Sequence, residues 1–364
     1  MKPTMITNIY DQPHALKDVY LHRHIFCDPW CDFIITHDIR RIYLVGSGTS
    51  YHASLAIKDD LQSFLSIECH VVIPTEFTRY QQIDPSKLYQ PSQILVIGIS
   101  QSGTSYSTVN ALHHAKRAGY LTLGLTGNSE AMIKEPCDCI LPLLCGMEGI
   151  PIETRGYSVT ILTGLLLAIS AASTLGMLSK ETFTAILQKI ETSILLLPVI
   201  IQESDTWFQK NQSWFLQMKK GAIAGYGRKH VSAKESALKL YETFHQPVIG
   251  FELEEMIHGY EMAFDQNQYL FLIAGKGEEL TSLEKYRTFF DELGCHQYLI
   301  TTESIELREQ DLQFSVCPDK LLDPITYVIP FQIFAARACE AIGYDTSVYP
   351  HKRKSFSHQR KEQE

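Results

Sequence analysis

Two segments in the first third of the chain share one plan: an apolar run, a short stretch of glycine and hydroxyl residues, and then a helix-like pattern. In the first, residues 42–45 lead into Gly-Ser-Gly-Thr-Ser at 46–50. In the second, residues 94–97 lead into Ser-Gln-Ser-Gly-Thr-Ser at 100–105. A loop of this kind between a strand and a helix gathers backbone N–H groups at the positive end of the helix dipole, which favours a bound phosphate. The pattern therefore predicts strands followed by helices and a phosphorylated small-molecule ligand.

The alternation continues along the first half of the chain. A leading amphipathic helix is expected around 13–26, and a buried one over 157–178. Strands are expected at 42–45, 69–73, 94–99, 121–126 and 139–143, with helices at 50–64 and 105–118. Near-continuous apolar strands that alternate with helices indicate a parallel sheet covered on both faces. The first half is therefore predicted to be a doubly wound α/β domain.

A second cycle follows a polar, amphipathic stretch at 179–220. Its expected elements are a strand at 222–225, a turn at 226–228, helices at 232–244 and 282–293, and strands at 269–274, 297–301 and 314–316. With 364 residues, the chain exceeds what one hydrophobic core usually supports. The predicted fold class is α/β with two tandem doubly wound parallel-sheet domains of flavodoxin-like type. The expected boundaries are 1–190, 191–340 and a C-terminal tail at 341–364 that contributes to the site.

Composition and charge exclude several classes of function. Apolar residues make up 45% and charged residues 20%, as in soluble globular proteins. The net charge of −9 disfavours a nucleic-acid partner. The N-terminus has no signal-peptide pattern, and hydroxyl residues interrupt the uncharged segment 157–178, which favours a buried helix over a membrane span. We expect a cytoplasmic protein without a membrane partner.

Nine cysteines are present, an odd number without a repeated CxxC spacing. Neither a disulfide framework nor a metal site is expected from this pattern. Cys27 and Cys31, with His22 and His24 nearby, only superficially suggest a metal cluster. Free thiols suit a reducing cytoplasm.

Glu235, Lys239 and Glu242 are separated by four and three residues, so their side chains share one helical face. A carboxylate and a lysine that face a sugar carbonyl supply what enolisation needs, a base for the carbon-bound proton and an electrophile for the developing oxyanion. The alternative is an exposed ladder of ion pairs. His258 suits proton shuttling because imidazole titrates near neutral pH, and its alternative is a surface or helix-capping histidine. The alternative to phosphate binding for the hydroxyl residues of the two loops is that they only cap the helices that follow.

These motifs occur together in one order: the two loops, then Glu-Ser-Ala-Leu-Lys-Leu-Tyr-Glu at 235–242, then Ile-His-Gly at 257–259. That order resembles the double sugar isomerase (SIS) domain family over about residues 35–355. The family includes the isomerase half of glutamine:fructose-6-phosphate amidotransferase, stand-alone fructosamine-6-phosphate deglycases and aminosugar-phosphate deaminases.

The resemblance implies roles for particular residues. Glu242 matches the general base that moves a proton between C1 and C2 of the open-chain sugar. Lys239 matches a lysine beside the substrate oxygens, and Glu235 matches a carboxylate one turn earlier. His258 matches the histidine that assists ring opening and that family members supply from a neighbouring subunit, and Lys354 resembles a C-terminal lysine near the reactive carbon. The expected phosphate and hydroxyl contacts are in the loops, at Ser47, Gly48, Thr49, Ser50, Ser100, Gln101, Ser102, Gly103 and Ser105.

Two departures from the family bear on the substrate. The first SIS-like domain begins close to Met1, so a glutamine-hydrolysing domain is not expected and glutamine is not the expected nitrogen donor. Glu153 stands where the amidotransferase has a small hydroxyl residue. This carboxylate, or the nearby Arg155, would contact an amine or an acidic substituent of the sugar, and the choice between them stays open.

The expected function is therefore that of an enzyme acting on an aminated or amino-acid-conjugated sugar phosphate, by isomerisation or by release of the amine. A simple aldose/ketose phosphate isomerase and a phosphosugar-sensing module without turnover are the alternatives. No cofactor is expected, because neither loop is a dinucleotide fingerprint. The apolar segments 157–178 and 194–201 carry more apolar surface than is needed to cover one face of a sheet. This favours a homodimer or a larger homo-oligomer.

Overall fold

The computed structural model describes residues 3–275 and 277–347. Its contacts divide the chain into two compact units. The N-terminal unit comprises residues 14–187, and the C-terminal unit combines residues 3–13 with residues 188–347. Whereas the sequence suggests a first domain over 1–190, residues 3–13 group with the C-terminal unit.

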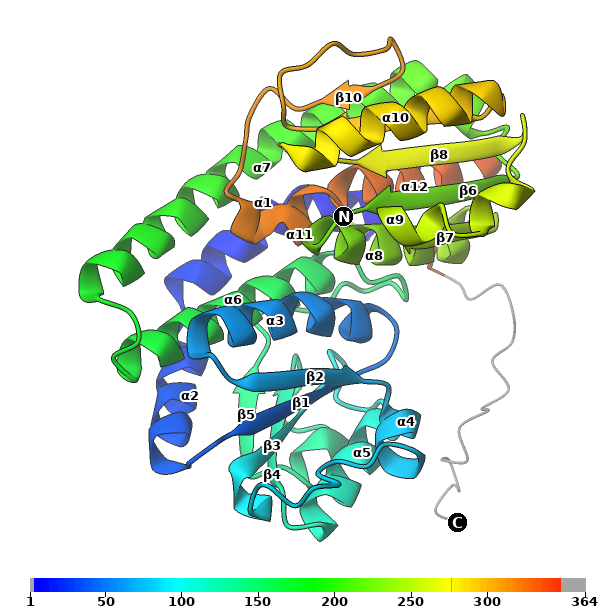
Figure 1. Cartoon of the computed structure of the whole chain (residues 1–364). Helices are drawn as coiled ribbons and strands as arrows, with labels where there is room; N and C mark the ends of the chain where they lie inside the picture. The colour runs from blue at the N-terminus through cyan, green and yellow to red at the C-terminus, as the bar shows by residue number, and fades with distance from the viewer. Residues whose placement is uncertain (1–2, 276, 348–364) are drawn as a thin grey trace. The chain divides into compact units, whose positions relative to one another are not determined.

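The N-terminal unit is built on a five-stranded parallel sheet in the order β2-β1-β3-β4-β5 (Figure 1). Its strands are β1 (Arg41–Val45), β2 (Glu68–Val72), β3 (Ile94–Ile99), β4 (Leu121–Thr126) and β5 (Cys139–Pro142). Helix α3 (Thr49–Leu65) connects β1 to β2, and α5 (Tyr106–Arg117) connects β3 to β4. Because parallel crossovers are right-handed and these two run in opposite directions along the sheet, the two helices cover opposite faces. The doubly wound α/β class is confirmed.

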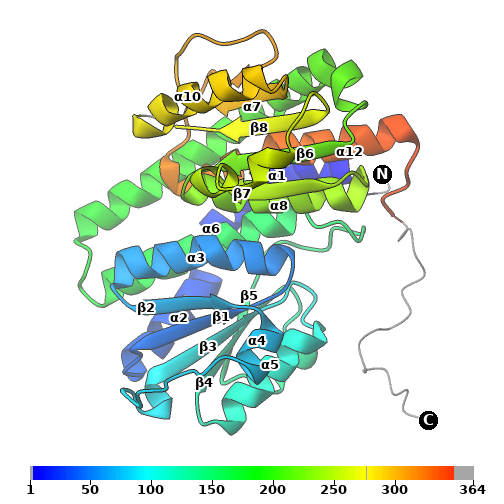
Figure 2. The same cartoon turned by 45° about the vertical axis from the view of Figure 1, so that its right-hand side comes forward.

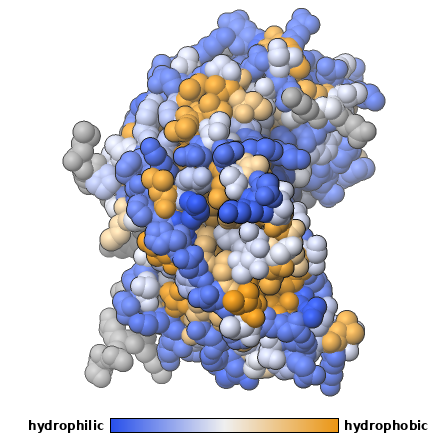
Figure 3. Space-filling view, turned by 90° about the vertical axis from the view of Figure 1, so that its left-hand side faces the viewer, coloured by the Kyte–Doolittle hydropathy of each residue, from blue (hydrophilic) through white to orange (hydrophobic). Residues whose placement is uncertain are grey.

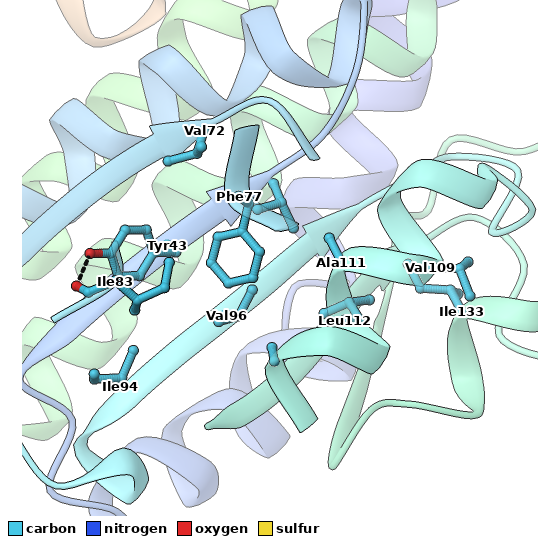
Figure 4. Packing of buried hydrophobic residues seen from close by; sticks show 12 residues of the cluster. Tyr43, Val72, Phe77, Ile83, Ile94, Val96, Val109, Ala111, Leu112 and Ile133 are labelled. Atoms are coloured by element: carbon cyan, nitrogen blue, oxygen red, sulfur yellow. Dashed lines mark hydrogen bonds between the residues drawn. The ribbon is translucent and has the colours of Figure 1, made fainter. Parts of the chain in front are cut away.

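One face of this sheet packs against α4 (Pro74–Arg79) and α5. Figure 4 shows the core between them, where the ring of Phe77 points toward Val96 and the Tyr43 hydroxyl donates a hydrogen bond to the Ile83 carbonyl at 2.5 Å. The strands β1 and β3 are buried along their whole length. This explains why the apolar runs of the sequence were continuous rather than alternating.

The other face is covered by α3 and by α6 (Arg155–Thr174), the uncharged helix expected near 157–178. Gly164 lets these helices approach closely, since a Cβ there would lie 2.3 Å from Cγ1 of Ile57. Trp30 of α2 (His24–Thr36) donates its indole N–H to the Leu167 carbonyl at 3.0 Å. The helix is therefore buried among α2, α3 and the sheet, and its apolar surface does not by itself require a second copy of the chain.

The leading helix was predicted at 13–26, but the structure has two helices there, α1 (Met5–Leu21) and α2. Proline is over-represented in the first turn of helices. Instead α1 runs through Pro13 and ends before His22 and Arg23, which separate it from α2.

The C-terminal unit repeats the arrangement with a parallel sheet in the order β10-β9-β8-β6-β7 (Figure 2). Its strands are β6 (Lys220–Gly225), β7 (Val248–Glu252), β8 (Gln268–Ile273), β9 (His296–Thr301) and β10 (Leu312–Gln313). Helix α8 (Arg228–Thr243) connects β6 to β7, and α10 (Glu278–Glu292) connects β8 to β9. Read from β7, the order is that of the first sheet, so the expected repeat of two doubly wound sheets is confirmed.

Several details of this unit differ from the sequence prediction. β7 was missed, since Gly250 interrupts its apolar run; a Cβ there would lie 2.6 Å from the Ala233 carbonyl oxygen. The last strand lies at Leu312–Gln313 instead of 314–316. The C-terminal helix α12 (Ile329–Ile342), which packs on α8, was not predicted. The remaining helical elements of the described chain are α7 (Lys180–Phe215), α9 (Leu253–Met256), α11 (Asp323–Thr326), and short 3-10 turns at Pro91–Gln93, Met132–Lys134, Tyr260–Ala263 and Lys320–Leu322.

Within the described part of the chain, three helical segments are long and apolar enough to cross a membrane by length and composition alone. In α6, 94% of the apolar window is buried inside the protein; the corresponding shares are 78% for Lys320–Ile342 and 39% for α7 (Lys180–Phe215). Helix α7 exposes Leu195 and Val199. Figure 3 shows a face on which apolar side chains gather in patches among hydrophilic ones. The oligomeric state stays a prediction.

Candidate functional site

The two hydroxyl-rich loops lie at the carboxyl ends of adjacent strands. β1 and β3 pair directly, with Val45 opposite Gly98 at their ends. After β1 the chain continues into α3 on one face of the sheet, and after β3 it continues into α5 on the opposite face. Ligands of open α/β sheets bind at such a switch point, outside the carboxyl ends of the strands. The N-terminal unit therefore places both predicted loops at its sheet's expected ligand edge.

Glycines shape the first loop. Gly48 has φ +58° and directly precedes α3, so its N–H and those of Thr49 and Ser50 lie at the start of the helix. A Cβ at Gly46 would lie 3.1 Å from the backbone carbon of Ser50, so the loop folds back tightly onto the helix. Ser47 and Gly48 are exposed, whereas Thr49 is buried.

The second loop is a tight turn between β3 and α5. The Gly103 N–H donates to the Ser100 carbonyl at 3.0 Å, and Gly103 has φ +67°. A Cβ there would lie 2.6 Å from Cβ of Ala131. Ser105 is the N-cap of α5, but its side chain makes no capping hydrogen bond, and the cap of α3 is a glycine. Helix capping by loop hydroxyls therefore does not account for either motif.

A buried carboxylate occupies the start of α6. Glu148 is 5% exposed, and it accepts hydrogen bonds from the Thr154 N–H at 3.1 Å, the Thr154 hydroxyl at 2.8 Å and the Gly156 N–H at 2.8 Å. Two of these donors are backbone N–H groups at the start of α6, where the helix itself offers no acceptor carbonyl, and a negative charge there is favoured by the helix dipole. The sequence analysis missed Glu148, because it lies in a loop without periodicity.

We expect Glu148→Gln to lower the free energy of unfolding by about 1–3 kcal/mol, because the amide turns a donor toward groups that are themselves donors. Urea unfolding followed by circular dichroism measures this. As a matched control, Glu135→Gln removes the same charge from an exposed position of the same unit and should change the free energy by less than about 0.5 kcal/mol. Equal stability of the two variants would contradict the capping role.

Glu153 lies beside the second loop. With its amide nitrogen facing the carboxylate, Gln101 donates to both oxygens of Glu153, at 3.1 and 3.2 Å. On its other side the Gln101 amide lies 3.3 Å from Sγ of Cys145, a buried thiol whose pKa burial raises to about 11. Arg155 donates from Nη2 to the Met147 carbonyl at 3.1 Å. The loop 143–154 thus brings one carboxylate into direct contact with the predicted phosphate loop.

In the C-terminal unit, α8 carries the predicted triplet. Lys239 Nζ lies 3.1 Å from Oε1 of Glu235 and 2.7 Å from Oε2 of Glu242. The side chains of Glu235 and Lys239 are fully buried, whereas that of Glu242 is 32% exposed. The alternative of an exposed ladder of ion pairs is therefore wrong. A buried lysine held between two carboxylates, one of them open to solvent, is a costly arrangement for structure alone.

His258 lies in the exposed turn after α9. It interacts electrostatically with Glu254, a carboxylate whose pKa is lowered chiefly by hydrogen bonds from the hydroxyls of Tyr286 and Tyr226, at 2.7 and 2.9 Å. Within residues 3–275 and 277–347, no hydrogen bond or ion pair joins His258 to Glu242. Lys354 lies outside the described residues.

The second sheet has its own switch point, between β6 and β8, and it is built differently. Gly227 has φ +51° and precedes α8 as Gly48 precedes α3. Lys229 takes the place of Ser50, with its Nζ 3.2 Å from both Glu279 and Asp323. Burial raises the pKa of Asp323 despite this lysine. Ion pairs of the protein thus occupy the edge that corresponds to the predicted phosphate edge.

In the described part of the chain, no group of three or more His, Cys, Asp or Glu side chains is arranged to hold a metal ion. Cys27 is buried and Cys31 is partly buried on α2 as free thiols, and burial raises the pKa of Cys27 to about 12.

The fold and the two hydroxyl-rich loops at the carboxyl edge of the first sheet define a class: α/β proteins with two doubly wound sheets of SIS type. Residues 35–172 match the SIS domain, so this part of the chain belongs to that family, as the motifs predicted. The isomerizing glutamine–fructose-6-phosphate aminotransferase of Idiomarina loihiensis is 28% identical over 355 residues, which cover 91% of this chain and 55% of that protein. The chain thus spans about half the length of the curated relatives it matches.

Solved structures match over nearly the whole chain. A Clostridium difficile structure provisionally assigned as a phosphosugar isomerase superposes with a TM-score of 0.87 at 26% identity, covering 97% of both chains. A Salmonella typhimurium structure provisionally assigned as a sugar-binding protein gives 0.79 at 27% identity, covering 91% of this chain and 99% of that one. The chain is therefore related to the phosphosugar isomerase type of SIS protein.

Proposed function

We propose that the chain is an enzyme that processes an aminated or amino-acid-conjugated sugar phosphate by proton transfer between C1 and C2 of the open-chain sugar. The observation that carries the proposal is the α8 triplet, in which a buried lysine contacts a partly exposed carboxylate at 2.7 Å. The loops after β1 and β3 supply backbone N–H groups and hydroxyls suited to the phosphate. No glutamine hydrolysis enters this proposal.

Glu242 acts as the base that takes the proton from the sugar carbon, and Lys239 stabilises the oxyanion that develops on the neighbouring oxygen. The carboxylate of Glu235 keeps Lys239 in place, at 3.1 Å from its ammonium. His258 assists ring opening, supplied by a neighbouring subunit of a homodimer or larger homo-oligomer. Lys354 is proposed to lie near the reactive carbon. The enzyme is proposed to work in the cytoplasm.

A substrate panel tests the proposal. The purified protein is incubated with glucosamine-6-phosphate, and ammonia and fructose-6-phosphate are assayed. In parallel it is incubated with the fructose-6-phosphate conjugates of lysine and of aspartate, and release of glucose-6-phosphate is assayed. We expect turnover of at least one of these compounds. Proton transfer between C1 and C2 converts the sugar into an imine, with a C=N double bond at the nitrogen-bearing carbon. One water molecule then hydrolyses this imine in each case, which breaks the C–N bond and releases the amine.

Two other results would replace the proposal. Interconversion of glucose-6-phosphate and fructose-6-phosphate without turnover of any amine would indicate a simple aldose/ketose isomerase. Tight binding of sugar phosphates with no turnover of any compound would indicate a sensing module.

A further inference from the structure

A cavity of about 400 Å³ lies at the amino end of β9 in the C-terminal unit. It is lined by the ends of α7 and α10, the first residues of β9 and the loop 308–310. Its volume is within the range of small-molecule binding sites. Ligands of open α/β sheets bind outside the carboxyl ends of the strands, so this cavity is separate from the switch point of its own sheet.

The two tryptophans of α7 differ in their surroundings. Trp207 is buried, and its indole N–H donates to the Gln310 carbonyl at 2.8 Å. Trp214 lines the cavity and is 52% exposed, and its indole N–H has no acceptor among the described residues. Its ring lies 5.5 Å from that of His296, which in turn stacks on Tyr269 at 4.4 Å. The cavity therefore presents one broad aromatic surface that two further rings support.

Asn211 gives the cavity a hydrogen-bond acceptor. It is only 3% exposed, and its amide nitrogen donates to the carbonyls of Trp207 at 3.1 Å and Gln310 at 3.3 Å. These two carbonyls decide which end of the amide is the donor. Within residues 3–275 and 277–347, the amide oxygen accepts no hydrogen bond. Because buried polar atoms are normally hydrogen-bonded, this oxygen suits a donor group on a ligand.

The charged side chains of the cavity compensate one another. Arg308 donates to both oxygens of Asp291, at 2.7 and 2.6 Å. Lys210 lies 3.8 Å from the carboxylate of Glu309 and donates to the carbonyl of the same residue at 2.6 Å. Burial lowers the pKa of His296, so its ring is largely neutral at pH 7. The lining thus has no net charge to attract an anion, but it offers donors and acceptors to neutral polar groups.

These features match a ligand with an apolar face and several hydroxyl groups. The C–H groups on one face of a sugar ring form an apolar surface that fits an indole, and each hydroxyl both donates and accepts hydrogen bonds. A wholly apolar ligand would leave the Asn211 oxygen without a donor, and an anion would find only paired charges.

We propose that this cavity binds a neutral sugar, with one face of its ring on Trp214 and a hydroxyl donating to the amide oxygen of Asn211. The site is separate from the proton transfer proposed for α8, and it does not depend on that function.

The fluorescence of Trp214 tests the proposal, because the other two tryptophans of the chain, Trp30 and Trp207, are buried and shielded from acrylamide. Quenching by acrylamide is measured while glucose, galactose, mannose or N-acetylglucosamine is titrated. Free tryptophan amide in the same solutions corrects for viscosity. We expect at least one sugar to lower the quenching constant about two-fold in a saturable manner, since it covers one of the two faces of the indole. Inorganic phosphate at the same ionic strength should not lower it.

Two variants locate the binding. Trp214→Leu, followed by calorimetry, should bind the same sugar at least about five-fold more weakly, because the ring contact is lost. Asn211→Leu should raise the sugar concentration needed for half-maximal protection of Trp214 at least about five-fold, the usual loss for one hydrogen bond. Phe289→Leu, which removes an exposed ring of the same unit outside the cavity, should leave the affinity unchanged.

Lack of protection by all four sugars overturns the proposal, as does wild-type affinity in Trp214→Leu or in a folded Asn211→Leu. Protection by inorganic phosphate would assign the cavity to an anion. Calorimetric binding of adenosine without binding of any sugar would assign it to a heteroaromatic base. Both results overturn the proposal as well. If Asn211→Leu does not fold, as judged by its thermal unfolding, Trp214→Leu decides, since that side chain is exposed.

Discussion

Replacing Glu242 by glutamine is expected to lower kcat by about 100- to 10,000-fold while the dissociation constants of sugar phosphates change by less than about two-fold. The amide keeps the shape of the side chain, which lies 2.7 Å from Lys239, but it cannot accept a proton from carbon. Steady-state kinetics with the substrate found in the panel, together with calorimetric binding, separate the two effects.

The control is Glu292→Gln, which removes an exposed carboxylate at the end of α10 in the same unit. Its kcat should equal that of the wild type. A second measurement is the exchange with deuterated solvent of the carbon-bound proton that the substrate presents to the base, on C2 for an aldose and on C1 for a ketose, which should be lost in Glu242→Gln. Wild-type rates of turnover and exchange in that variant would exclude Glu242 as the base.

Replacing Lys239 by methionine is expected to lower the free energy of unfolding by about 3–5 kcal/mol, because the fully buried Glu235 then loses the ammonium that compensates its charge. Equilibrium unfolding in urea measures the change. The double variant Glu235→Leu with Lys239→Met should recover most of it, since it removes the buried charge together with its partner.

Lys234→Met is the matched control, because Lys234 lies on the same helix and is only partly buried. Its free energy of unfolding should stay within about 0.5 kcal/mol of the wild type. Turnover should be lost in the double variant even where stability is recovered, since the electrophile is gone. A double variant that is both stable and active would remove Lys239 from the chemistry.

The sequence predicted most of the fold because its strands are apolar along their whole length. β4 was placed at its observed bounds, 121–126, and β3 at 94–99. Prediction failed where local and tertiary signals differ. Gly250 concealed β7, and α8 begins at Arg228 rather than 232 since Gly227, with a positive φ, starts the helix directly.

The site was predicted less completely than the fold. The spacing of Glu235, Lys239 and Glu242 placed them on one face, but only the structure shows that the first two are fully buried. Periodicity describes which residues share a face and not what covers it. Gln101 and Glu153 are 52 positions apart, so their contact depends on how β3 and the loop after β5 meet at one sheet edge.

The two switch points have diverged within one chain. Where the first sheet presents small hydroxyl residues, the second has Lys229 held by Glu279 and Asp323. At this second edge the side chains of the protein neutralise one another, and phosphate recognition is proposed only for the first edge. Each polypeptide would then bind one phosphate group. Substitutions at the first sheet edge would change ligand affinity, and substitutions at the second would change thermal stability.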